Sequence, residues 1–200
     1  MTRLTALLLS IGLLLSACGS VPPAPIDRFY RLQPVSVFSV AKSLPGAIVV
    51  QPFRADSLYA ERPIIYSEEA SARQLRQYHY HLWLYPPAQL VREHFTSSLG
   101  RTLDLTGGDS APNVLDGRVT GFERVLSGKS SKAVVALELR LQAGGKTLLS
   151  KTYQAEQPAA DESLGAFAVA IEQALGKIYA EFLADVARTC CHARVSGSAS

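Results

Sequence analysis

A stripe of apolar side chains near the C-terminus constrains the fold of this 200-residue chain more than any other feature. It repeats at spacings of three and four residues within residues 161–187, the pattern of a helix with one buried face. Asp161 or Ser163 can cap the first turn. The stripe consists of Leu164, Phe167, Ala168, Ile171, Leu175, Ile178, Phe182 and Val186. Such a helix needs a second layer to bury its apolar face, and we expect that layer to be a sheet.

The segment before this helix supplies three strands of the expected sheet. Residues 115–121 and 133–141 alternate between apolar and polar side chains, which is typical of a strand with one face in water. The links SGKSS and AGGK have the composition of hairpin turns. Residues 146–154 then complete a three-stranded antiparallel meander.

Shorter elements occupy the first half of the chain. We expect strands at residues 27–32, 47–53 and 62–67. Pro86 and Pro87 begin a helix with one apolar face, which ends near Gly100. Together these elements predict an α+β fold: a mainly antiparallel sheet with two helices packed on one face, the longer of them C-terminal.

The N-terminus has the features of a bacterial lipoprotein signal. Arg3 precedes an apolar run at residues 4–15, which is shorter than the roughly 20 residues of a membrane span. The run ends in the lipobox LSAC, whose cysteine is Cys18. We expect cleavage before Cys18 and attachment of a diacylglycerol to its thiol; an ordinary secretory signal is the alternative. By resemblance to bacterial lipoproteins, Gly19 implies sorting to the outer membrane.

The expected domain organisation follows from this signal. Residues 1–17 are the signal peptide, and residues 18–27 are the lipidated cysteine with a Pro-rich tether. Residues 28–187 have the length of one domain. Residues 188–200 are expected to be a flexible tail.

The two remaining cysteines and the charge balance indicate little specific chemistry. Cys190 and Cys191 are adjacent, too close for an unstrained disulfide, so no role or a pairing between chains is expected. The formal net charge of +3 includes Arg3 of the signal, which leaves the mature chain near neutrality. Nucleic-acid binding needs a basic stripe, and this balance together with the expected compartment excludes it.

Residues 77–87 combine aromatic residues with two histidines. Alternation predicts a strand with Tyr78, Tyr80 and Leu82 on one face and His79, His81 and Trp83 on the other. Aromatic side chains with polar tips favour interfaces, so we predict that Tyr78, Tyr80 and Tyr85 contact a partner. Packing in the core is the alternative for this cluster.

No motif in the sequence indicates catalysis. A nucleophile elbow, a Walker loop, H-E-x-x-H and paired C-x-x-C motifs are absent. His79 and His81 could share a strand face, but a metal site needs a further ligand such as His94 or His192. We therefore expect no catalytic residue, no bound metal and no cofactor, and we expect that the protein is not an enzyme.

The order of several loose motifs resembles a known family. A lipobox and tether precede F-Y-R-L, then I-V-V-Q-P-F and P-I-I-Y, then Y-H-Y-H-L-W-L-Y-P-P at the start of a helix. D-G-R-V and a long C-terminal helix follow. This order is similar to that of the ABC-type transport auxiliary lipoproteins, the group that includes the paraquat-inducible protein C lipoprotein. The resemblance covers essentially the whole mature domain.

The resemblance implies a non-enzymatic role. Such proteins are lipid-anchored partners of MCE-type transport systems, which move lipids or other hydrophobic molecules between the inner and outer membranes. It implies an outer-membrane, periplasm-facing protein that docks an MCE-domain protein, with a homo-oligomer as a further option. Trp83, Pro86 and Pro87 match the family's strand–helix junction, and Phe29 and Tyr30 match its first strand, so these five residues are expected to be structural.

Three other functions are compatible with the same residues. The first is a direct lipid-binding carrier with a pocket between the helices and the sheet. The second is a periplasmic enzyme or metal protein that uses His79 and His81. The third is a general scaffold lipoprotein of the cell envelope.

Overall fold

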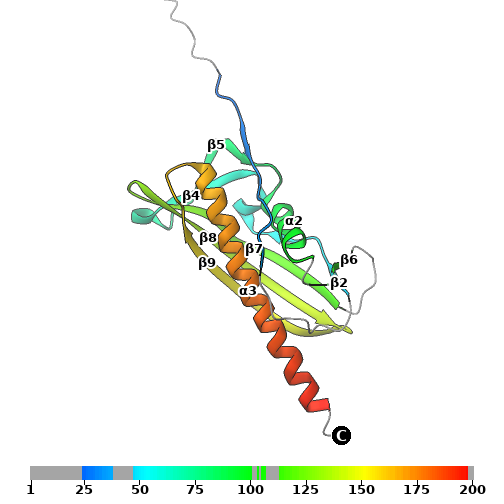
Figure 1. Cartoon of the computed structure of the whole chain (residues 1–200). Helices are drawn as coiled ribbons and strands as arrows, with labels where there is room; N and C mark the ends of the chain where they lie inside the picture. Colours follow the sequence, from blue (N-terminus) through cyan, green and yellow to red (C-terminus); the bar gives the residue numbers. More distant parts are fainter. Residues whose placement is uncertain (1–23, 38–46, 101–102, 104, 107–112, 198–200) are drawn as a thin grey trace, which may run out of the picture.

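The computed structural model describes residues 24–37, 47–100, 103, 105–106 and 113–197, with side chains up to residue 189. In this part of the chain, nine strands form one mixed sheet, and two long helices pack on it (Figure 1). The described N-terminal segment and the end of the C-terminal helix lie at opposite ends of an elongated molecule (Figure 1). Cys18 and most of the predicted tether lie outside the described residues.

The elements follow the order expected from the sequence. They are β1 (Arg28–Tyr30), β2 (Ile48–Val50), β3 (Arg54–Ala55), η1 (Ser57–Ala60), β4 (Pro63–Glu68), η2 (Glu69–Ser71), β5 (Arg76–Trp83), α2 (Pro87–Leu99), β6 (Leu105–Thr106), β7 (Asn113–Ser127), β8 (Ser130–Ala143), β9 (Lys146–Pro158) and α3 (Leu164–Gly197). Each predicted strand overlaps an observed one. The predicted start of α2 at the two prolines and its end at Gly100 are confirmed.

The predicted meander is also confirmed. β7, β8 and β9 pair antiparallel in sequence order. Gly128 in the first turn has φ +59°, and Gly144 and Gly145 in the second have φ +53° and +77°. Side chains with a Cβ rarely adopt this left-handed conformation, so these turns need glycine.

The sheet is mixed rather than purely antiparallel, because several strands of the first half of the chain pair in the parallel direction. β2, β3 and β4 pair in succession along one edge of β7, and all three run parallel to it. β1 likewise pairs parallel to β5. The chain reaches β7 only after crossing over through α2, and such a crossover brings a strand back in the parallel direction.

α3 packs across the meander with the predicted stripe buried. Ser163 Oγ accepts a hydrogen bond from the Ala166 N–H (3.0 Å), so Ser163 caps the helix. The predicted end at residue 187 is wrong, because the helix continues to Gly197 through most of the segment expected to be a flexible tail. Among the described residues, no helix combines the length and hydropathy that crossing a membrane requires.

One hydrophobic core joins both helices to the same face of the sheet. Phe95 on α2 contacts Tyr179 and Phe182 on α3, with ring centroids 5.1 and 6.0 Å apart. Tyr153 on β9 meets Phe182 edge to face, with ring centroids 6.1 Å apart. Alternate residues of β7 and β8, such as Leu115 and Leu137, fill the sheet side of this core. The predicted placement of two helices on one face is therefore confirmed.

Candidate functional site

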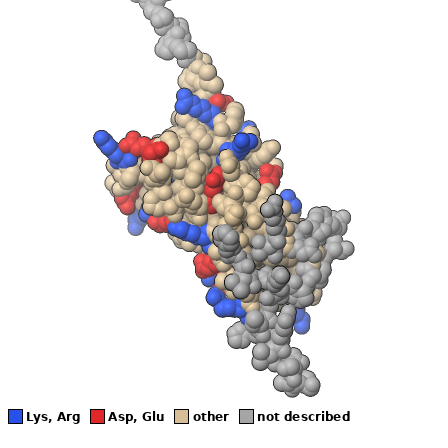
Figure 2. Space-filling view, in the orientation of Figure 1, with Lys and Arg blue, Asp and Glu red and all other residues tan. Residues whose placement is uncertain are grey.

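Exposed apolar side chains gather where the N-terminal segment joins the sheet. Seven large hydrophobic residues are exposed in the described part of the chain, and five of them belong to β1, to β5 or to the residues directly beside them. These five, which we call the apolar edge, are Ile26, Phe29, Tyr80, Leu84 and Tyr85. Uncharged surface covers much of the face near the described N-terminal segment, and basic atoms lie beside it (Figure 2).

Pairing between β1 and β5 positions the apolar edge. Phe29 is the register partner of Leu82, and the Leu84 N–H donates to the Tyr30 carbonyl (2.7 Å). Arg62 holds Phe29 in place, because its guanidinium carbon lies 5.0 Å from the centre of the Phe29 ring. Arg62 Nε also donates to the Trp83 carbonyl (3.1 Å). Arg62 therefore contacts both the exposed phenyl ring and the end of β5.

Trp83 is buried directly beneath the apolar edge. Its ring centroid lies 5.1 Å from that of Phe122 on β7 and 5.9 Å from that of Phe167 on α3. Pro86 and Pro87 follow at the start of α2. Trp83 thus contacts both the sheet and α3 just before the strand–helix junction.

The predicted strict alternation along β5 is wrong. Pro63 pairs with Leu82 but Ile65 pairs with Gln77, so β5 carries three more residues than β4 between these pairs. This bulge brings the rings of Tyr78 and His81 to a centroid distance of 5.6 Å, although alternation would place them on opposite faces.

Tyr78 consequently differs from the other two predicted partner-binding tyrosines. It is half-buried, stacks on Tyr66 with ring centroids 4.5 Å apart, and accepts a hydrogen bond from Arg124 Nη1 (3.2 Å). Tyr80 and Tyr85 are 46% and 40% exposed. Only these two have the free surface that a partner contact requires, and their role stays a prediction.

The two histidines of β5 lie in different environments. His79 is exposed, while His81 Nδ1 is hydrogen-bonded to Tyr30 Oη (2.9 Å). Partial burial lowers the pKa of His81, and the positive charge of Arg28 lowers it further. No group of three or more potential ligands is placed to hold a metal among the residues that the structure describes.

His94 lies on α2, and its contacts in the described part of the chain are with Gln33 and Tyr179 rather than with the β5 histidines. Its Nε2–H donates to the Gln33 carbonyl (2.9 Å), so Nδ1 accepts from the Tyr179 hydroxyl (3.0 Å). Burial lowers the pKa of His94 to about 4, although the bond to Gln33 opposes the shift. His94 therefore joins the N-terminal segment to both helices. The side chain of His192 lies outside the described residues.

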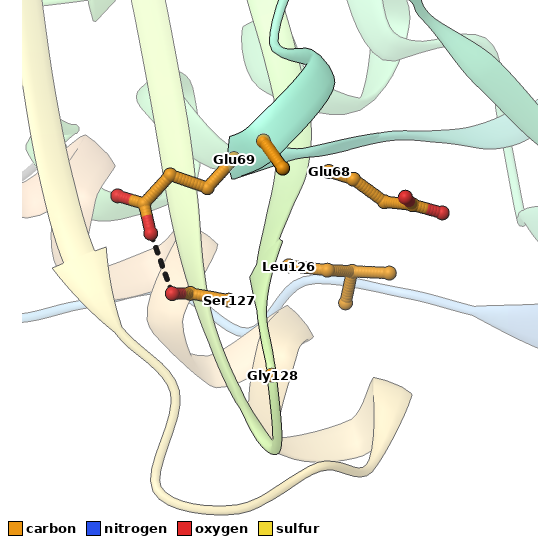
Figure 3. Close-up of a pocket in the computed structure, with 6 residues that line it drawn as sticks. Glu68, Glu69, Leu126, Ser127 and Gly128 are labelled. Carbon is orange, nitrogen blue, oxygen red and sulfur yellow. Dashed lines mark hydrogen bonds between the residues drawn. The ribbon is translucent and has the colours of Figure 1, made fainter.

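A groove of about 600 Å³ lies between η2 and the β7–β8 turn (Figure 3). Ser127 Oγ donates to Glu69 Oε2 (2.5 Å), while Glu68 extends in a different direction over Leu126 (Figure 3). Arg76 pairs with Glu68 at 2.9 Å. Both carboxylates thus have partners among the described residues.

The family is decided by comparison with known proteins. The model of the family described as "ABC-type transport auxiliary lipoprotein component" matches residues 30–182. The chain belongs to this family. The match begins within β1 and ends in α3, so it includes Tyr80, Leu84 and Tyr85 of the apolar edge, whereas Ile26 and Phe29 precede it.

Solved structures show that the fold is shared. A crystal structure of a protein from Xanthomonas campestris superimposes with a TM-score of 0.71 at 18% identity, covering 84% of this chain and 99% of that one. A second crystal structure, of an uncharacterised protein, gives 0.65 at 17% identity and covers 82% and 97% of the two chains. No curated protein matches. At these identities the likeness of this auxiliary lipoprotein to solved structures concerns the fold alone.

Sequence reasoning missed two residues that organise this region. Arg124 is 6% exposed, donates to Tyr78 and donates through Nη2 to the Glu162 carbonyl (2.6 Å) before α3. Arg62 supports Phe29 and Trp83 as described above. The sequence signal for Arg124 was its position among the apolar residues of β7. A buried arginine needs hydrogen-bond acceptors, so such a position indicates a residue that joins neighbouring elements.

Proposed function

We propose that this auxiliary lipoprotein is anchored in the outer membrane, faces the periplasm and is a non-catalytic component of an MCE-type ABC transport system. The system would move lipids or other hydrophobic molecules between the inner and outer membranes. The observation that carries the proposal is the family match over residues 30–182 in a chain that also has a lipobox at Cys18.

The proposed mechanism is tethering. Acyl chains on Cys18 hold one end of the chain in the membrane, and two or more chains give stable anchoring where one is marginal. The folded domain then binds the MCE-domain protein of the conduit. The proposal does not depend on the sequence-based prediction that Tyr78, Tyr80 and Tyr85 contact a partner; of these three, Tyr78 is half-buried and only Tyr80 and Tyr85 are exposed.

The packing of the core favours tethering over direct lipid carriage. A carrier needs room for acyl chains between the helices and the sheet, but large side chains fill this space. Phe95, Phe182 and Tyr153 are each at most 1% exposed and contact one another across it. If mass spectrometry detects lipids that co-purify with the soluble domain, which lacks the acylated cysteine, the carrier function is favoured instead.

Replacement of Cys18 tests the anchoring. We expect Cys18→Ala to leave the domain folded, to release it from the outer-membrane fraction and to abolish its function, because the acylated thiol is lost. Cys190→Ala is the matched control and should leave fractionation unchanged. Membrane fractionation and full activity of the Cys18→Ala protein would rule the anchoring out.

A pull-down tests the transport role. The acylated chain is expected to co-purify with an MCE-domain protein encoded beside an ATPase and a permease. If the MCE-domain protein from such a neighbourhood shows no binding in a purified two-component assay, the scaffold function replaces the transport role.

A further inference from the structure

We propose that the apolar edge lies directly against the lipid surface of the membrane that holds the anchor. Ile26, Phe29, Tyr80, Leu84 and Tyr85 would enter the headgroup region, and the folded domain would therefore stand on the bilayer by this end. The inference rests on the proposed anchoring for its location, but the contact itself belongs to the domain.

The composition of the apolar edge suits a bilayer interface. Ile26 is 82% exposed and Phe29 52%, and both side chains lack a polar group that would prefer water. Tyr80 and Tyr85 add rings with a polar tip, the type of side chain that is enriched at the level of lipid headgroups. Exposed apolar residues are common singly, but a group of them at one end of a fold indicates a contact surface.

Basic side chains border the same strand. Arg28 and Arg31 flank Phe29 and Tyr30, and Arg62 reaches over the Phe29 ring. Asp27 and Glu61 offset part of this charge, so the surface is only slightly positive. Arginines at such a border can keep their guanidinium groups among phosphates while their aliphatic stems lie beside apolar residues. We therefore expect a weak preference for anionic lipids.

The position of the apolar edge close to the predicted anchor favours lipid over protein as its partner. Only eight peptide units separate Cys18 from Ile26, which limits their separation to about 30 Å at full extension. The described chain enters the domain at this end, while α3 ends at the opposite one (Figure 1). A short tether raises the local concentration of lipid at this surface, so a weak intrinsic affinity is sufficient. A protein partner would have to share this narrow space with the membrane.

The first experiment measures binding without the acyl chains. The mature chain with Cys18→Ser is mixed with vesicles of phosphatidylethanolamine containing a minor fraction of phosphatidylglycerol, and the bound fraction is measured by sedimentation. The double variant Phe29→Ser with Tyr85→Ser should bind at least about tenfold more weakly, since two exposed rings are lost. Leu58→Ser with Val169→Ser is the matched control, because these residues are 40% and 48% exposed on η1 and α3.

The second experiment uses the acylated protein in vesicles that contain brominated lipid. Phe29→Trp adds one exposed indole to the buried Trp83, and Leu58→Trp places it outside the apolar edge. We expect strong quenching of the added emission only for Phe29→Trp. Equal quenching of both proteins overturns the inference.

The outcomes separate this inference from the proposed function. If the Phe29 and Tyr85 double variant binds vesicles like the parent but loses its MCE-domain partner, the apolar edge is a protein-docking surface and the lipid contact is wrong. If Cys18→Ala alone fails to release the protein from membranes, the anchoring fails while the vesicle measurements still decide the lipid contact.

Discussion

His94 is a histidine whose surroundings favour the neutral imidazole. It is 4% exposed, and its two nitrogens are used by the Gln33 carbonyl and the Tyr179 hydroxyl. Protonation would require Nδ1 to donate as well, and the charge would be buried without a carboxylate among the hydrogen-bond partners of the imidazole. Burial accordingly lowers the pKa of His94 to about 4 in the folded protein.

This shift predicts a loss of stability in mild acid. The folded pKa of His94 lies below the usual value near 6.5, so the unfolded state binds the proton first as the pH falls. The contribution is complete above pH ~6.5 and is lost between pH ~6.5 and 4, by about 3 kcal/mol in total. Urea unfolding at several pH values measures it.

The matched variant for this measurement is His94→Gln, which keeps an amide for hydrogen bonding but does not titrate. We expect a lower stability at pH 7 and a flatter dependence between pH 6.5 and 4.5. Carboxylates titrate equally in both proteins and cancel in the comparison. An identical slope in the two proteins would show that His94 is protonated without cost.

At the residue scale, exposure was predictable only in part from the sequence. Only the resemblance to a known family separated Trp83 from Tyr85, because it implied a structural role for Trp83 at the strand–helix junction. It could not separate Tyr78 from Tyr80. That difference depends on Arg124 and on the bulge in β5, and both involve strands far apart in sequence.

At the scale of elements, β7 packs so closely against Phe53 that one of its positions has no room for a side chain. A Cβ added to Gly117 would lie 2.6 Å from atoms of the Phe53 ring, which covers the strand at this position. Gly117→Ala should therefore displace the ring and lower the free energy of unfolding by about 1–3 kcal/mol. Thermal or urea denaturation of the variant checks this value.

Gly165→Ala is the control for Gly117→Ala. Gly165 is exposed in the first turn of α3, and its added Cβ meets nothing closer than Ser163 Oγ at 3.7 Å. We expect this variant to be unchanged or more stable by up to about 1 kcal/mol, because alanine loses less entropy in a helix. A Gly117→Ala protein as stable as the control would mean that Phe53 moves freely.

Element types were largely predictable, but strand pairing was not. A period of two marks β7 and β8 as strands, and short glycine turns force their antiparallel pairing. The short apolar runs of β2 and β4 carry no information on direction. Their parallel pairing with β7 depends on the path through α2, which the sequence pattern of either strand does not contain.

At the scale of the whole molecule, the fold has two ends with different exposed surfaces. The N-terminal end carries the apolar edge, and the opposite end carries the last turns of α3 (Figure 1). The fold class and the placement of both helices followed from the sequence because amphipathic patterns report which faces are buried. The gathering of Phe29, Tyr80 and Tyr85 at one end arises from pairing between β1 and β5, so it became visible only in the structure.

The succession of β2, β3 and β4 along β7 also fixes the order in which this chain can fold. The meander of β7, β8 and β9 closes through two short turns and can form early, whereas β2 to β4 must wait for a strand made much later. During synthesis, we therefore expect the apolar Ile48–Val50 segment to lack its strand partners until β6 and β7 have been made. The sheet of the first half is therefore completed only when β7 has been made.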